Sequence, residues 1–225
     1  MTLTAPSLEQ FRTPRGRAAS LYTREGTSDH NNVLACLQED EYGIAALNLH
    51  GTALDIGAHI GGVTIALALD NPDLHVIAVE ALSANIEVLT ANVEANGIAD
   101  RVTIVHGAAD KPGKKSSDVH WGFDDNETGS HHRFIGNAQL LGITGGDVET
   151  VNAWQLPTEE IAFAKIDCEG CEYNVFASPN VKHIALIVGE FHGGFEQIVD
   201  LLGGTHVVTQ TSGIETFGGF KAVRR

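Results

Sequence analysis

The sequence predicts an α/β fold in which helices cover both faces of a mostly parallel sheet. Short segments rich in Val, Ile and Ala recur along the chain, helical patterns separate the first of them, and a glycine-rich turn follows the first segment. Strands that are buried on both faces have such continuous apolar runs. Alternation of strand and helix is typical of parallel strands joined by right-handed crossovers. We therefore expect one doubly wound sheet.

Composition fits a single globular domain and argues against two kinds of partner. Of the 225 residues, 43% are hydrophobic and 19% are charged, which is ordinary for a globular protein. Asp and Glu outnumber Lys and Arg by 29 to 14, and the net charge of −15 repels nucleic-acid phosphates and anionic membrane surfaces. The N-terminus lacks the apolar core of a signal peptide, and no segment has the roughly 20 apolar residues of a membrane helix. We expect a cytoplasmic protein without membrane contact.

Two segments precede the sheet. Residues 1–28 are polar and Arg-rich with two prolines, which predicts an irregular N-terminal arm. Residues 29–49 carry apolar side chains near the helical period, but Gly43 interrupts them, so we expect a broken helix. The single domain is expected over 29–225.

Five short apolar segments are expected to form the parallel strands, and a helix is expected at 82–97 after the second. Ser83 is the candidate cap of that helix, and Gly97 is a natural end. The apolar face of the helix consists of Leu82, Ile86, Leu89 and Val93. The predicted strands span residues 52–56, 75–80, 101–106, 161–167 and 184–190.

The last part of the chain and its middle have different patterns. Two alternating segments around 212–216 predict an antiparallel hairpin in the tail, which brings the sheet to seven strands. Gly, Asp, His, Lys and Ser dominate residues 107–150, where apolar residues are scattered. A loop of that length is usually functional or disordered, so we expect a lid or substrate loop there.

The turn "DIGAHIGG" after the first strand is expected to approach a ligand. Ligands of open parallel sheets bind beyond the carboxyl ends of the strands. Gly57 and Gly61 remove side chains at a bend, and a helix that begins near Gly62 directs free N–H groups toward that place. The Gly-x-x-x-Gly spacing differs from the Gly-x-Gly-x-x-Gly spacing of dinucleotide sites.

Two acidic residues indicate which ligand the turn binds. Asp55 precedes the glycines and could attract an ammonium group through charge-assisted hydrogen bonds. Glu80 ends the second strand, where an acidic residue can hold two ribose hydroxyls. An aminoacyl group and a ribose without a pyrophosphate describe S-adenosylmethionine.

The chain also resembles the FkbM family of class I methyltransferases, from about Arg24 to Arg225. The resemblance is carried by "TREGTSDHNNV", "ALDIGAHIGG", "VIAVEALSANIEVLTANVEANG", "GAADKPG", "AKIDCEGCEYNVF" and "IVGEFHGG", of which "KIDCEGCE" is the most diagnostic. His59 stands where the family usually has Asn, Ala81 where Pro commonly follows the acidic residue, and "VNAWQL" replaces a more usual Leu-Asp pair. The resemblance implies a Rossmann-like fold and S-adenosylmethionine as cofactor. The cofactor residues that it implies are Ser28, Asp55, Gly57, Ala58, His59, Gly61, Thr64, Glu80, Ala81, Ala109 and Asp167.

The ends of the fourth and fifth strands are expected to hold the methyl acceptor. Asp167 and Glu169 follow the fourth strand, and Glu190 and His192 follow the fifth. His192 is the candidate general base because histidine titrates near neutral pH; a structural or substrate-orienting role is the alternative. Asp167 and Glu169 are the other catalytic candidates. No metal is expected, although two carboxylates and His192 could hold a divalent ion.

The three cysteines do not suggest a disulfide framework. Cys168 and Cys171 have C-x-x-C spacing, but a zinc site would need a second pair, so two incidental thiols are expected.

The expected function is O-methylation of a small molecule, a substrate class that the resemblance implies. A methyltransferase of protein or RNA and a non-catalytic binding module are the alternatives, and the acidic composition makes RNA the poorer choice. The sequence leaves the oligomeric state open, with a homodimer as one option.

Overall fold

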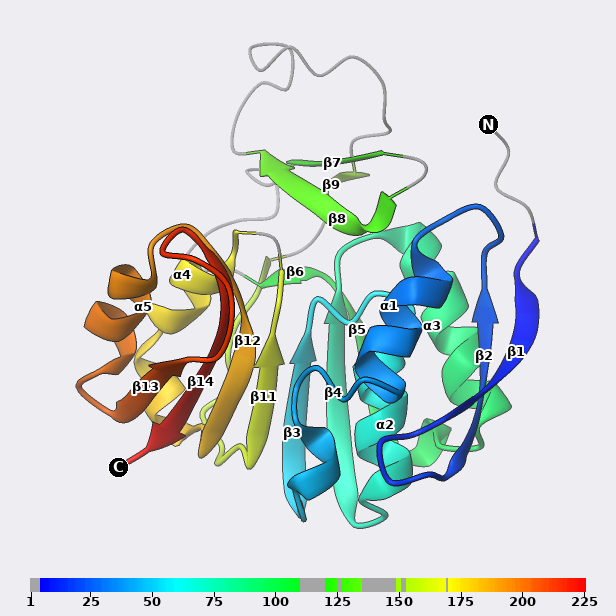
Figure 1. Ribbon diagram of the computed structural model, residues 1–225, viewed down its shortest axis with the longest axis horizontal. Coiled ribbons are helices and arrows are strands. Elements are labelled where there is room, and N and C mark those ends of the chain that lie inside the picture. The colour runs from blue at the N-terminus through cyan, green and yellow to red at the C-terminus, as the bar shows by residue number, and fades with distance from the viewer. Residues whose placement is uncertain (1–4, 110–119, 125–126, 135–148, 151–152, 169) are drawn as a thin grey trace.

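The computed structural model describes residues 5–109, 120–124, 127–134, 149–150, 153–168 and 170–225. The strands of its main sheet are β3 (Gly51–Ile56), β4 (Leu74–Glu80), β5 (Val102–His106), β11 (Phe163–Ile166), β12 (Leu186–His192), β13 (His206–Gln210) and β14 (Phe217–Arg224). They lie in the order β13-β14-β12-β11-β3-β4-β5 (Figure 1). The strands from β12 to β5 are parallel, and β14 is antiparallel to both its neighbours. The predicted seven-stranded sheet with a C-terminal hairpin is confirmed.

Helices cover both faces of this sheet, as expected. On one face, α1 (Asp29–Leu37), α2 (Gly62–Asp70) and α3 (Ser83–Ala95) contribute to a core cluster that includes Ala53. On the other face, α4 (Glu172–Phe176) and α5 (Phe195–Leu202) contribute to a second cluster that includes Leu54. Neighbouring residues of one strand thus enter different clusters because successive side chains of a strand point to opposite faces.

Glycines end or interrupt the helices where the sequence predicts it. Gly97 follows α3 with φ +64°, and Gly43 has φ +65° between α1 and a short 3₁₀ helix, Ile44–Ala46. The expected cap of α3 is wrong: the extended residue before the helix is Leu82, and Ser83 is its first helical residue.

The N-terminal segment is not an irregular arm. Strands β1 (Ser7–Arg12) and β2 (Ala18–Thr23) form an antiparallel hairpin that packs on the domain. Alternate residues of β2 are buried, with Ala19 and Leu21 at 0% exposure. Side-chain oxygens on α3 accept hydrogen bonds from β2: Asn92 from Tyr22 N at 2.5 Å, and Asn96 from Ser20 N at 3.0 Å. The two prolines and the arginines hid this alternation in the sequence.

The described residues of the segment 107–150 include strands. Strand β6 (Ala108–Ala109) pairs with β10 (Ala153–Trp154). Strands β7 (His120–Asp124), β8 (Glu127–Phe134) and β9 (Glu149–Thr150) form a separate antiparallel sheet above the carboxyl ends of the parallel strands (Figure 1). Residues 110–119, 125–126 and 135–148 lie outside the described residues, so the predicted lid stays a prediction.

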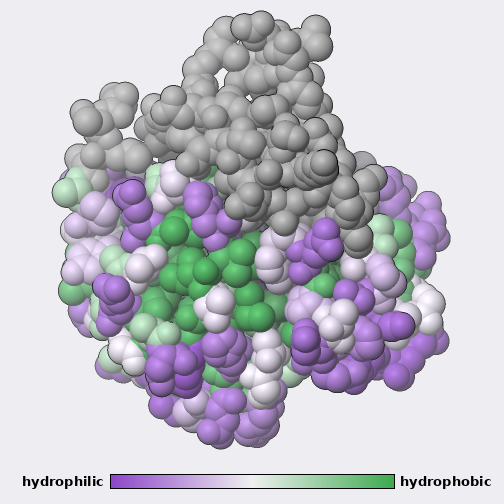
Figure 2. Space-filling model, turned by 180° about the vertical axis from the view of Figure 1, so that it is seen from behind, coloured by the Kyte–Doolittle hydropathy of each residue, from purple (hydrophilic) through white to green (hydrophobic). Residues whose placement is uncertain are grey.

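Part of the second core cluster reaches the surface. Between β5 and β11, the described residues contain no helix, and Ile77 and Val105 are only partly buried. From behind, hydrophobic residues gather below the grey atoms, with hydrophilic residues around them (Figure 2). None of the helices in the described ranges has the length and apolar character that a membrane crossing requires.

Candidate active site

A cavity of about 370 Å³ lies at the carboxyl ends of the parallel strands. The residues that follow β3, β4, β5 and β11 line it, and α1 closes one side. Pockets for small molecules commonly enclose about 300–1,000 Å³. Strands β3 and β11 lie side by side; the strands that follow β3 in the chain extend to one side, and those that follow β11 extend to the other. Open α/β sheets bind their ligands at such a reversal of strand order.

Glu80, the last residue of β4, is held in place by backbone donors of two loops. Its Oε2 accepts a hydrogen bond from His59 N at 2.8 Å, and its Oε1 accepts one from Leu82 N at 3.0 Å. Only 7% of Glu80 is exposed, and that part faces the cavity. Asn85 Nδ2 also donates to Oε1, at 3.3 Å. A carboxylate has about four acceptor sites, so Glu80 can still accept one hydrogen bond from a hydroxyl group in the cavity.

The two glycines of the turn have different roles. Gly57 lines the cavity with φ +77°, and a Cβ atom there would lie 1.8 Å from the carbonyl oxygen of Asp167. Gly61 has φ +97°, does not line the cavity, and would place a Cβ atom 2.5 Å from Leu89 Cδ1. Gly57 thus lets the turn pass the end of β11, whereas Gly61 lets α2 pack on α3.

His59 joins the turn to the N-terminal part of the chain. It has φ +51°, and its Nε2 lies 3.2 Å from Asp29 Oδ1. Asp29 also forms a buried ion pair with Arg24, at 2.7 Å. The cavity-lining residues that the sequence predicts as cofactor contacts are Ser28, Gly57, Ala58, His59, Glu80, Ala81, Ala109 and Asp167.

Asp55 and Thr64 do not line the cavity, contrary to the prediction. Thr64 Oγ1 donates to Asp55 Oδ2 at 2.6 Å, and Lys165 Nζ lies 3.5 Å from Asp55 Oδ1. Asp55 has no exposed surface, so its ammonium partner is the side chain of Lys165 rather than a ligand. The end of β3 is buried on both faces, so the side chain of Asp55 cannot reach the cavity.

Lys165 connects the glycine turn to β11. Its Nζ donates to the Gly57 carbonyl at 2.6 Å and lies 3.9 Å from Asp167 Oδ2. Burial alone would lower the pKa of Lys165, but the carboxylates of Asp55 and Asp167 outweigh burial and raise it. Lys165 is therefore a fixed cation between the turn and the acceptor side.

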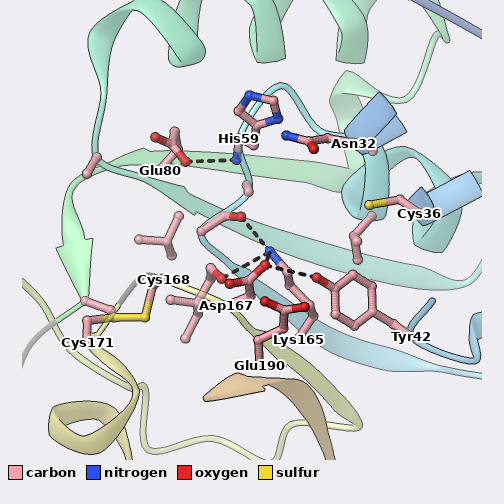
Figure 3. Close-up of a pocket in the computed structure, with 18 of the residues that line it drawn as sticks. Asn32, Cys36, Tyr42, His59, Glu80, Lys165, Asp167, Cys168, Cys171 and Glu190 are labelled. Atoms are coloured by element: carbon pink, nitrogen blue, oxygen red, sulfur yellow. Dashed lines mark hydrogen bonds and ion pairs between the residues drawn. A yellow bond between two sulfur atoms is a disulfide. The ribbon is translucent and has the colours of Figure 1, made fainter. Parts of the chain in front are cut away.

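Asp167 lies at the opposite part of the cavity from Glu80 (Figure 3). Tyr42 Oη donates to Asp167 Oδ2 at 3.0 Å. Burial and the charge of Asp167 raise the pKa of Tyr42, so the phenol keeps its proton and remains a donor. Glu190, at the end of β12, also lines this part of the cavity.

His192 lies beside this group, oriented by a buried carboxylate. Its Nδ1 is 3.0 Å from Glu172 Oε1, and its Nε2 is 3.9 Å from Glu190 Oε2. Glu172 has no exposed surface, and its Oε1 also accepts from the backbone N–H groups of Cys168 and Gly170. The catalytic candidate Glu169 lies outside the described residues.

Cys168 and Cys171 form a disulfide, which corrects the expectation of two incidental thiols. Both residues line the cavity. The turn between β11 and α4 brings their Cα atoms to 5.5 Å, a separation that suits a disulfide. Cysteine count and spacing do not predict this disulfide, because it depends on the conformation of the turn.

Several cavity residues have no distinct signal in the sequence. They follow or belong to α1, and their side chains reach the cavity only because α1 packs over the strand ends. The acidic run at 39–41 is the one local hint. These residues are Asn32, Cys36, Glu41 and Tyr42.

Comparisons with known proteins agree with this fold. A structure described as a candidate O-methyltransferase from Nostoc punctiforme has a TM-score of 0.51 and 11% identity, and the match covers 88% of this chain and 58% of that one. M. capricolum TrmK, in complex with S-adenosylhomocysteine, has a TM-score of 0.50 and 8% identity, over 83% of this chain and 67% of that one. The fold is therefore the Rossmann-like fold of methyltransferases.

The sequence itself identifies the family. No curated protein matches the chain. Residues 55–216 match the methyltransferase FkbM domain. This stretch includes the cavity-lining residues from Ile56 to Glu190. The chain therefore belongs to the FkbM family of methyltransferases.

Proposed function

We propose that this methyltransferase uses S-adenosylmethionine to methylate a hydroxyl oxygen of a small molecule. The observation that carries the proposal is that one and the same cavity contains Glu80 in one part and Asp167 with Glu190 in another (Figure 3). These are the two places that a nucleoside cofactor and an acceptor would need.

The residues of the first part fit the cofactor. Glu80 can accept a hydrogen bond from a ribose hydroxyl at its remaining acceptor site, and the backbone of Gly57 and Ala58 leaves space for the aminoacyl chain. Small side chains at Ala81 and Ala109 leave room for the base. When bound, the cofactor supplies an activated methyl group on a sulfonium.

On the acceptor side, the chain must align the hydroxyl and release its proton. The hydroxyl oxygen forms the new bond to the methyl carbon as the carbon–sulfur bond breaks, which releases S-adenosylhomocysteine. The hydroxyl proton passes to His192, the candidate base, or to solvent. Exclusion of water and alignment at near-attack distance are the main tasks of the protein. Asp167 and His192 are the residues that we place there.

Charge argues against an anionic acceptor such as RNA. The chain carries a net charge of −15, which opposes binding of an RNA backbone. The acceptor part of the cavity is lined by Asp167, Glu190 and Glu41, so an anionic group would be repelled there as well.

Incubation with cofactor that carries a labelled methyl group tests the proposal. The label should appear in the small-molecule fraction of a metabolite extract, and mass spectrometry should locate it on oxygen. Glu80→Gln should reduce the transfer at limiting cofactor. Label found only in added RNA or protein would refute the proposed substrate class.

A further inference from the structure

Asp167, Glu190 and His192 lie at the ends of two paired strands and form one group, here called the acceptor triad. Each offers one ligand atom, and these atoms all lie within 4.8 Å of one another. Ligands of a tetrahedral zinc ion lie about 3.4 Å apart, and opposite ligands of an octahedral ion with bonds of about 2.1 Å lie about 4.2 Å apart. Small side-chain rotations are therefore enough for the acceptor triad to share one ion.

The orientation of His192 directs its Nε2 atom toward Glu190. Glu172 accepts a hydrogen bond from Nδ1 at 3.0 Å, so a neutral imidazole carries its proton there and its lone pair on Nε2. Nε2 is 3.9 Å from Glu190 Oε2, beyond hydrogen-bond range. In this tautomer the lone pair of His192 and the carboxylate of Glu190 lie on the same side, where one cation could bind both. A buried carboxylate behind a histidine is also the usual second partner of a histidine that binds metal.

The charge of the surrounding cavity agrees with a cation at this place. Among the described lining residues, carboxylates outnumber the one lysine, Lys165. Lys165 is already held by Asp55 and by the Gly57 carbonyl. The side chains of the acceptor triad are 20–27% exposed, so an ion can reach them from solvent and would still be partly shielded from it.

We infer that the acceptor triad binds a divalent cation of the Mn²⁺ or Zn²⁺ kind, ions that accept both imidazole and carboxylate ligands. Three protein ligands leave coordination positions open. Asp167 and Glu190 line the cavity, so the open positions face it. An acceptor with two adjacent oxygen atoms fits such a site, and the ion favours loss of the hydroxyl proton to solvent. His192 then acts as a ligand, and its role as a base is the alternative.

The proposed acceptor class rests on the proposed function, but metal binding can be measured without any turnover. A failure of this inference can therefore be distinguished from a failure of the proposed function. Untagged full-length protein is stripped with a chelator, desalted and titrated with Mn²⁺, and the free ion is followed by electron paramagnetic resonance. One ion per chain is expected. Glu190→Gln and His192→Asn should each weaken binding at least tenfold. Glu196→Gln, an exposed carboxylate on α5, is the matched control and should bind as the unchanged chain does.

Three results would overturn the inference. The first is no binding of Mn²⁺ or, in a parallel calorimetric titration, of Zn²⁺. The second is unchanged binding in Glu190→Gln and His192→Asn, provided that circular dichroism shows both variants folded. The third concerns the acceptor: full methyl transfer by the stripped protein in chelator, with loss of activity at low pH that disappears in His192→Asn, would make His192 the base.

Discussion

Glu80 shows how a single side chain can be fixed by the fold and still serve a ligand. Glu80→Gln keeps one acceptor oxygen but removes the charge, so we expect a loss of about 1.5–3 kcal/mol in the binding of S-adenosylhomocysteine, the scale of a charge-assisted hydrogen bond. Calorimetry measures the dissociation constant. Glu87→Gln, an exposed change on α3, should leave it as it is. An unchanged constant in Glu80→Gln would mean that Glu80 does not hold the ribose.

Gly57 tests the close approach between the turn and β11. Gly57→Ala places a methyl group 1.8 Å from the Asp167 carbonyl oxygen at φ +77°. Gly97→Ala has a similar φ of +64° but open space, so it should cost only about 1–2 kcal/mol for the left-handed backbone. The steric contact should add about 1–3 kcal/mol to the loss in Gly57→Ala. Urea denaturation measures both, and equal losses would show that the turn is free to move away from Asp167.

At single residues, the sequence predicts some contacts and misses others for a physical reason. The sequence predicts Glu80 and Gly57 as cofactor contacts because strand ends and tight turns leave a local pattern, and both residues line the cavity. Asp55 was expected there too, but its partner Lys165 lies 110 residues away on the paired strand, at 3.5 Å. Nothing near Asp55 in the sequence records this pairing.

At the scale of elements, the apolar runs predict the five parallel strands well because most of their residues are buried. The edge strand β5 is the exception, since Thr103 and His106 are exposed. The hairpin β1–β2 has one buried face, and the prolines and arginines in and around it obscure that alternation in the sequence. The disulfide was missed for a different reason, since it depends on the turn between β11 and α4.

The C-terminal hairpin contains a histidine that should make stability depend on pH. His206 begins β13 without exposed surface, and one ring nitrogen lies 2.9 Å from the Ile184 carbonyl. Burial lowers the pKa of His206, and nearby Arg224 adds to the effect. The unfolded chain therefore binds the proton more readily, so stability should fall as the pH drops below about 6.5, by at most about 1.4 kcal/mol per pH unit from this group.

Urea denaturation at pH 7.5 and pH 5.0 measures this dependence. His206→Gln should lose less stability between the two values than the unchanged chain does. His50→Gln, an exposed histidine whose side chain is 64% accessible, should lose as much as the unchanged chain, since carboxylates titrate alike in both. Equal losses in all three proteins would exclude His206 as the source.

At the scale of the whole molecule, the cavity is assembled from segments that span most of the chain, from Ser28, just before α1, to Glu190 on β12. The predicted parallel sheet brings these strand ends together, because the carboxyl ends of parallel strands share one edge. The packing of α1 over that edge follows from the core contacts of Val33 and Leu37, which no pattern within α1 specifies.

A ligand that fills this cavity contacts both halves of the sheet and should stabilise the folded chain as a unit. S-adenosylhomocysteine at about 100 times its dissociation constant should add roughly 2.7 kcal/mol, which corresponds to about 5–10 °C in melting temperature for a chain of this length. Differential scanning calorimetry measures the shift. NADH should give none, because the turn lacks the dinucleotide spacing. At the same ligand concentration, a tenfold weaker Glu80→Gln should lose about half of the stabilisation, since each tenfold change is worth about 1.4 kcal/mol. A shift with NADH and none with S-adenosylhomocysteine would show that the cavity between β3 and β11 binds a different class of ligand.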